Sequence, residues 1–112
     1  MSDFTLDLIP TRRHLHTIAE MGWGEFETTA YVIERLEQLG WTVFAGKQQI
    51  CESAVMGRDP VFVQKHLDRA RERGVSESTL EKMQGYTGCI ALWDTGRPGP
   101  VTALRFDIDG VG

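Results

Sequence analysis

The segment from Phe26 to Gly40 constrains the fold more than any other, because it predicts an amphipathic helix that leads directly into a strand. Apolar side chains recur in it at steps of three and four residues, at Phe26, Ala30, Ile33, Leu36 and Leu39. This spacing places them on one face of a helix. Gly40 ends the pattern, as a glycine just past the last helical turn commonly does. The run from Trp41 to Phe44 is rich in β-forming side chains and predicts a buried strand. Helix, glycine and strand in succession favour an α/β fold.

Three further helices are predicted. The first covers residues 4–20. The next begins after Asp59, an N-cap residue followed by proline in the first turn, and ends before Gly74. The last begins with an S-x-x-E capping box at Ser78 and ends near Gly85. Between these helices, residues 48–51 are compatible with either a short strand or a loop.

The spacing of apolar residues changes after residue 86, from the pattern of helices to that of strands. Residues 87–93 and 101–106 are apolar runs of strand length, and the glycines and prolines of residues 94–100 between them are typical of a turn. We expect the two runs to pair as an antiparallel hairpin. The three tryptophans, Trp23, Trp41 and Trp93, lie beside glycines or in predicted strands, and we expect them in the core.

Composition sets the class of protein. The chain has 112 residues, of which 41% are hydrophobic and 25% charged, which is typical of one globular domain with a modest core. The formal net charge of −4 provides no basic field for nucleic acid. No apolar run approaches membrane-spanning length, and the first residues are acidic where a signal peptide is basic. We therefore expect a cytoplasmic protein that binds neither nucleic acid nor membrane, with Cys51 and Cys89 as reduced, half-buried thiols.

Two carboxylates at the end of the last predicted strand are the candidate site. Asp107 and Asp109 are two residues apart, so in a strand both would lie on one face, at the carboxyl end where ligand sites of α/β folds occur. Such a pair suits metal ligation or acid–base work. Two aspartates can equally end a strand and cap the next segment.

Residues 106–110, Phe-Asp-Ile-Asp-Gly, resemble the first motif of haloacid-dehalogenase-like phosphatases. That resemblance implies Asp107 as the phosphoryl nucleophile, Asp109 as an acid/base and Mg²⁺ on the phosphate. In that family the motif opens the fold, whereas here it comes at the end of the chain.

A second set of motifs spans nearly the whole chain. Its first half follows the order R-R-x-x-H-x-x-P-E, E-x-x-T and I-x-x-x-L-x-x-x-G, and comprises Arg12, Arg13, His16, Ala19, Glu20, Glu25, Thr28, Ile33, Leu36 and Gly40. Ala19 stands where the pattern has proline. Its second half follows T-G-x-x-A, G-x-P-G-P and L-R-x-D-M-D-A-L, and comprises Thr87, Gly88, residues 96–100 and residues 104–109. These motifs resemble the opening of the M20 metallopeptidase and amidohydrolase family. The insertion with Glu52, Met56 and the arginine-rich helix resembles the branch that contains the A subunit of aminobenzoyl-glutamate hydrolase.

The resemblance implies the N-terminal part of a three-layer αβα, zinc-peptidase-like catalytic domain, with residues 1–112 as one incomplete domain. It implies a metal-dependent amidohydrolase acting on a small amide, an N-acyl amino acid or an aminobenzoyl-glutamate-like compound. In such enzymes Zn²⁺ or Mn²⁺ polarises the scissile carbonyl and activates a water, and a Glu acts as general base. By position, Asp107 occupies the slot of a metal ligand, and Asp109 matches the Asp that orients the ligands.

The remaining metal-binding motifs of the family are missing from this sequence. We therefore expect a truncated chain that binds no metal tightly and has no turnover alone, because two aspartates cannot supply the four or more ligands that such a site needs. A non-catalytic split subunit that assembles with a second hydrolase chain is an alternative, and the phosphatase is another.

Overall fold

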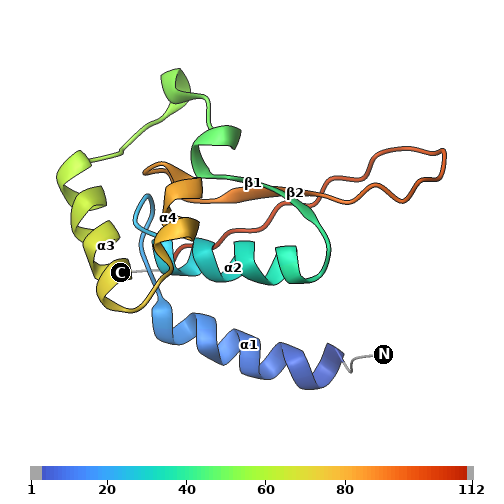
Figure 1. Cartoon of the computed structure of the whole chain (residues 1–112), viewed down its shortest axis with the longest axis horizontal. Helices are drawn as coiled ribbons and strands as arrows, with labels where there is room; N and C mark the ends of the chain where they lie inside the picture. Colours follow the sequence, from blue (N-terminus) through green and yellow to red (C-terminus); the bar gives the residue numbers. More distant parts are fainter. Residues whose placement is uncertain (1–3, 111–112) are drawn as a thin grey trace.

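The computed structural model describes residues 4–110 and contains four α-helices, two short 3₁₀ helices and two strands. In chain order they are α1 (Phe4–Ile18), α2 (Phe26–Gln38), β1 (Thr42–Ala45), η1 (Gly46–Gln49), η2 (Glu52–Ala54), α3 (Pro60–Glu72), α4 (Glu77–Met83) and β2 (Cys89–Leu92). Helix α2 contacts the other three α-helices and both strands, and α1 lies on the side of α2 away from α4 and the sheet (Figure 1).

The four predicted helices are confirmed, and two of their end signals act as expected. Gly40 has a φ of +90°, the left-handed conformation that ends α2. The Asp59 carboxylate accepts a hydrogen bond of 3.0 Å from the Val61 N–H at the start of α3. The predicted capping box at Ser78 is wrong. The N-cap of α4 is Ser76, and its hydroxyl pairs with that of Ser78 at 2.7 Å instead of capping the helix.

The predicted hairpin is also wrong. β2 pairs with β1, antiparallel, in the register Thr42 with Leu92 and Ala45 with Cys89. Residues 101–106 form no strand, and among residues 4–110 no backbone hydrogen bond joins residues 101–109 to another segment. A run of β-forming residues becomes a strand only when its backbone finds a partner, and the partner predicted for this run pairs with β1. Residues 48–51 form no strand either, since Gly46–Gln49 is a turn of 3₁₀ helix.

The core lies between α2, α3, α4 and the face of the sheet that carries Val43 and Ala45. Its buried members are Phe26, Ala30, Ile33, Ala45, Val63, Ala70, Leu80 and Met83. The expectation of a buried β1 is wrong, because only Ala45 of that strand is buried. Trp41 and Trp93, also expected in the core, are 37% and 52% exposed, and their rings lie against each other with centroids 5.6 Å apart. Trp23 is half-buried and packs against the core.

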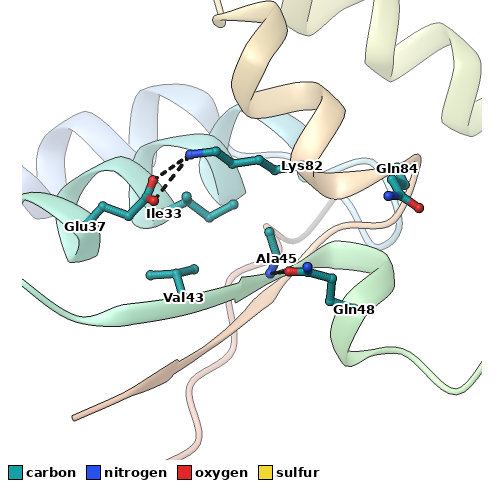
Figure 2. A pocket seen from close by; sticks show the side chains of 7 residues that line it. All are labelled: Ile33, Glu37, Val43, Ala45, Gln48, Lys82 and Gln84. Atoms are coloured by element: carbon teal, nitrogen blue, oxygen red, sulfur yellow. Dashed lines mark hydrogen bonds and ion pairs between the residues drawn. The ribbon is translucent and has the colours of Figure 1, made fainter.

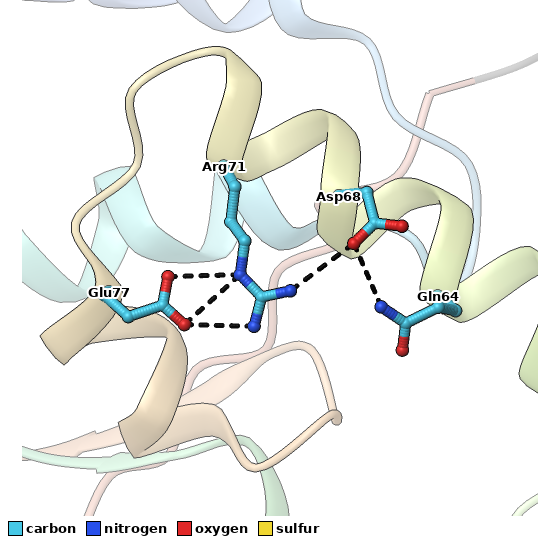
Figure 3. Close-up of polar contacts among 4 residues, drawn as sticks. All are labelled: Gln64, Asp68, Arg71 and Glu77. Atoms are coloured by element: carbon cyan, nitrogen blue, oxygen red, sulfur yellow. Dashed lines mark hydrogen bonds and ion pairs between the residues drawn. The ribbon is translucent and has the colours of Figure 1, made fainter.

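Polar contacts join α3 to α4. Arg71 lies between Asp68 and Glu77, and its guanidinium donates to Glu77 at 3.0 to 3.2 Å and to Asp68 at 3.4 Å (Figure 3). Gln64 donates to the same Asp68 oxygen at 3.0 Å. Arg71, one of the basic residues at the end of α3, thus faces acidic side chains of this chain, as a residue on a solvated helix face does.

Candidate functional site

The two aspartates of the predicted site lie in an exposed, extended segment. Asp107 has a side chain that is 79% exposed, and it pairs with Arg105 at 3.3 Å. The prediction that Asp107 and Asp109 share a face depended on a strand that the structure does not form. The phosphatase motif has the same requirement, since its Asp follows a strand, so the local structure gives that alternative no support.

Residues 4–110 contain no group of three or more His, Cys, Asp or Glu side chains placed to hold a metal ion. Two exposed carboxylates leave most of the coordination sphere of Zn²⁺ or Mn²⁺ unfilled. These residues therefore do not fit such an ion without ligands from elsewhere.

A buried polar network lies where the second set of motifs places its acidic and threonine residues. Glu20, only 3% exposed, accepts hydrogen bonds from the backbone N–H of Glu27 at 3.1 Å and from that of Thr28 at 2.8 Å. It also accepts one from the Thr28 hydroxyl at 2.8 Å. These N–H groups belong to the first turn of α2 and have no partner within the helix. Glu20 thus caps α2 from outside, where the helix dipole favours a negative charge.

The same network reaches the start of β2. Glu25 is 8% exposed and accepts a hydrogen bond of 3.0 Å from the Thr87 hydroxyl. The Thr29 hydroxyl, one turn further along α2, accepts one of 3.0 Å from the Gly88 N–H. These two hydrogen bonds join residues that are 62 and 59 positions apart in the chain. They fix the first turn of α2 against the start of β2.

Burial raises the pKa of the Glu25 carboxyl above its ordinary value of 4.5. The charge of Asp109 raises that pKa further, while the hydrogen bond from Thr87 lowers it. The influence of Asp109 shows that one of the two predicted site residues lies within electrostatic reach of the network.

The end of the extended segment is fastened to the linker between α1 and α2. The Gly110 N–H donates to the Glu20 carbonyl oxygen at 2.5 Å, and a Cβ at position 110 would lie 3.1 Å from the Ala19 carbonyl carbon. Ala19 itself has a φ of +38°. A proline ring fixes φ near −65°, so the proline of the motif pattern could not adopt this conformation.

The motif letters Glu20, Glu25, Thr28, Thr87 and Gly88 carried no predicted role of their own. In the structure they are the residues that join the helix start, the strand start and the end of the extended segment. One signal in the sequence could have identified the two acidic residues: Glu25 stands immediately before the amphipathic helix that begins at Phe26, and Glu20 stands in the linker that leads to it, where N-terminal N–H groups need acceptors.

A small pocket lies elsewhere. It has a volume of about 120 Å³ and lies between α2, β1 and α4, lined by Ile33, Glu37, Val43, Ala45, Gln48, Lys82 and Gln84 (Figure 2). Lys82 and Glu37 form an ion pair of 3.0 Å across it. None of the predicted site residues lines this pocket, so it gives no support to the predicted chemistry.

Both cysteines are free thiols, as expected. Cys89 is half-buried, and burial raises its pKa. Cys51 is exposed rather than half-buried, and a hydrogen bond with Ser53 lowers its pKa.

Among the helices of residues 4–110, none has both the length and the apolar character to span a membrane.

Comparison with known proteins identifies relatives of the chain, although no protein-family model matches it. It is 48% identical over 105 residues to the homolog, in Haemophilus influenzae, of the p-aminobenzoyl-glutamate hydrolase A subunit, covering 93% of this chain and 25% of the relative. The p-aminobenzoyl-glutamate hydrolase A subunit of Escherichia coli is 42% identical over 89% of this chain and 23% of its own length. The indole-3-acetyl-aspartic acid hydrolase of Enterobacter agglomerans is 38% identical over 99% of this chain and 27% of its own length.

A solved structure agrees with these sequences. The aminobenzoyl-glutamate utilization protein of Klebsiella pneumoniae superimposes with a TM-score of 0.88 and 35% identity, over 96% of this chain and 28% of that protein. Sequence and fold together show that the chain is homologous to part of the M20-type amidohydrolases, as the motifs predicted. More particularly, the chain is homologous to the N-terminal quarter of two hydrolases, the aminobenzoyl-glutamate hydrolase A subunit together with indole-3-acetyl-aspartic acid hydrolase. It spans about a quarter of the length of these relatives.

Proposed function

We propose that this chain is the opening part of a three-layer αβα catalytic domain in a metal-dependent amide hydrolase. The observation that carries the proposal is similarity along almost the whole chain, in sequence and in fold, to hydrolases named for two related substrates. Aminobenzoyl-glutamate and indole-3-acetyl-aspartate each join an aromatic acid to an acidic amino acid through one amide bond. The proposed substrate class is therefore an N-acyl amino acid with such an amide.

The chain contributes structure and two carboxylates to that reaction. Residues 1–112 act as one unit in which the Glu20 network sets the position of α2 and holds Gly110, the residue next to Asp109. We assign Asp107 to the slot of a metal ligand and Asp109 to orienting the ligands around it. The remaining ligands for Zn²⁺ or Mn²⁺ come from residues outside positions 4–110. Two relatives are named as one subunit of a hydrolase, which supports a second hydrolase chain as a partner.

A chimera tests the proposal. This chain replaces the matching N-terminal quarter of the Escherichia coli hydrolase, and hydrolysis of p-aminobenzoyl-glutamate is measured with added Mn²⁺ or Zn²⁺. We expect the chimera to hydrolyse the amide and its Asp109→Asn variant to lose most of that activity. A control chimera with Asp94→Asn, an exposed residue in the loop after β2, should keep it. A folded chimera that binds metal but hydrolyses nothing would contradict the proposal. We expect no hydrolysis by the 112-residue chain alone.

A further inference from the structure

The loop of residues 55–58, between η2 and α3, is fastened by contacts with two other parts of the chain (Figure 1). The Trp23 indole N–H donates to the Met56 carbonyl oxygen at 2.7 Å. The Arg58 guanidinium lies over the Tyr86 ring, 4.4 Å from its centroid, and donates to the carbonyl oxygen of the preceding residue at 2.9 Å. The Trp23 and Tyr86 rings meet edge to face, with centroids 6.4 Å apart. These contacts hold the loop against the linker between α1 and α2.

The fastened loop presents a side chain that residues 4–110 do not bury. Met56 is 82% exposed. Ordering a loop costs conformational entropy, and burial of apolar side chains usually offsets that cost. Here the contacts use the backbone of Met56 and the side chain of Arg58, while the methionine side chain remains in solvent. An exposed methionine on an ordered loop suits contact with an apolar ligand, because its flexible thioether adapts to rings of different shape.

The linker that fastens the loop has an unusual backbone. Trp23 has a φ of +67° and Ala19 a φ of +38°, in the left-handed region that residues other than glycine rarely adopt. Such conformations cost free energy and cluster at functional sites. Both residues lie at contacts with distant segments. Trp23 binds the loop, and Ala19 lies against Gly110.

The same linker reaches the two carboxylates of the proposed site. Glu25 lies two residues after Trp23, and the charge of Asp109 raises the pKa of its carboxyl. The N–H of Gly110, the residue next to Asp109, donates to the Glu20 carbonyl oxygen. The loop and the aspartate segment are therefore fastened to one short stretch of chain, which places the loop beside the proposed site.

We propose that Met56 is a specificity-determining residue of the hydrolase and that its side chain contacts the aromatic ring of the acyl group. The inference rests on the proposed function and names the part of the substrate that this chain recognises. The proposed substrates join different aromatic acids to an acidic amino acid, so the acyl side of the amide needs an apolar surface that adapts. Two aspartates cannot provide such a surface. Trp23 is a positioning residue, because it acts through the backbone of Met56.

Inhibition by the two halves of a substrate tests the proposal. In the Escherichia coli chimera, kcat and KM are measured for p-aminobenzoyl-glutamate, and inhibition constants for p-aminobenzoate, which has the ring, and for glutamate, which has none. Met56→Ala removes the side chain but keeps the carbonyl oxygen that Trp23 binds. We expect it to raise KM and the inhibition constant of p-aminobenzoate about tenfold. The value of kcat and the inhibition constant of glutamate should change less than about twofold.

Three further variants separate recognition of the ring from a structural role. Leu8→Ala is the matched control, because Leu8 is 67% exposed but lies on α1, and it should change none of these constants. Met56→Leu keeps an apolar side chain of similar size and should recover most of the lost affinity. Trp23→Phe keeps a ring but removes the N–H, so it should raise the same two constants as Met56→Ala.

Equal changes for p-aminobenzoate and glutamate, or no change for either, would overturn the role of Met56. Calorimetric titration with p-aminobenzoyl-glutamate separates this inference from the proposed function. A folded chimera that binds the compound, binds it more weakly with Met56→Ala and hydrolyses nothing would support the role of Met56 and contradict the proposed function. Hydrolysis that Met56→Ala leaves unchanged would do the reverse. A folded chimera that does not bind the compound would contradict both.

Discussion

Residues 18–92 and residues 93–110 both contain apolar runs of strand length in the sequence, but their structures are very different. The first region buries Phe26, Ile33 and Met83 completely and pairs its two strands. The second contains Phe106, Leu104 and Val101, yet it buries none of them and forms no strand. Apolar, β-forming residues are therefore insufficient for a strand. They need a backbone partner and a surface to cover, and within residues 4–110 only the first region has both.

The largest expected effect compares two glycines, one in each region. Gly46 has a φ of +46°, and a Cβ there would lie 2.2 Å from the Tyr86 carbonyl oxygen and 2.4 Å from that of Met83. Gly46→Ala should cost about 3 kcal/mol or more of unfolding free energy, because backbone must move. Gly96 has a φ of +72° but open space around it, so Gly96→Ala should cost only about 1 kcal/mol. Urea denaturation measures both, and equal costs would contradict the packing at Gly46.

An effect of comparable size separates two phenylalanines. Phe26→Ala removes a side chain with no exposed surface and should cost about 3 to 5 kcal/mol. Phe106→Ala changes a side chain that is 77% exposed and should cost less than about 0.5 kcal/mol in this chain. Chemical denaturation of the two variants is the measurement. A large loss from Phe106→Ala would show that the extended segment is packed in solution.

Glu20 tests the side-chain cap of α2 within the first region. Glu20→Ala leaves the Thr28 N–H and hydroxyl without their buried acceptor and should cost about 1 to 3 kcal/mol. Glu81→Ala, on an exposed position of α4, should change the unfolding free energy by no more than about 0.5 kcal/mol. Thermal denaturation compares the two. If both variants lose the same stability, Glu20 does not cap α2.

The smallest effect is a dependence on pH. The folded state raises the pKa of Glu25 above 4.5, so between 4.5 and that raised value the folded chain holds a proton that the unfolded chain has lost. Glu25 therefore stabilises the fold fully below pH 4.5 and loses that contribution as the pH rises through the folded pKa. Stability measured against pH should fall less steeply across this window for Glu25→Gln than for the wild type.

Asp109→Asn sharpens the same comparison. Because the Asp109 charge raises the pKa of Glu25, its removal should move that pKa back toward 4.5. An NMR titration of the Glu25 carboxyl measures the change, and Asp107→Asn serves as the control. An unchanged Glu25 pKa in Asp109→Asn would show that the charge of Asp109 has no effect on the buried network around Glu25.

The positions and ends of the helices could be predicted because their causes are local. The spacing of apolar residues from Phe26 to Leu39, the glycine after it and the Asp59 cap all act within a few residues. The relationship to M20-type amidohydrolases could also be predicted, since ordered motifs are read along the chain. Strand pairing could not. The partner of β2 is separated from it by two α-helices and two 3₁₀ helices, whereas the run at residues 101–106 is close in sequence. The contact between Glu25 and Thr87 was missed for the same reason, because the two residues are 62 positions apart.

The sequence by itself determined four helices, a modest core and the family of hydrolases to which this chain is related, because periodicity, capping residues and motif order are properties of neighbouring residues. Only the tertiary structure decided that β2 pairs with β1, that Glu20 and Glu25 are buried acceptors, and that Asp107 is exposed. These outcomes depend on which distant groups exclude water from one another, and on which surfaces residues 4–110 leave without a partner.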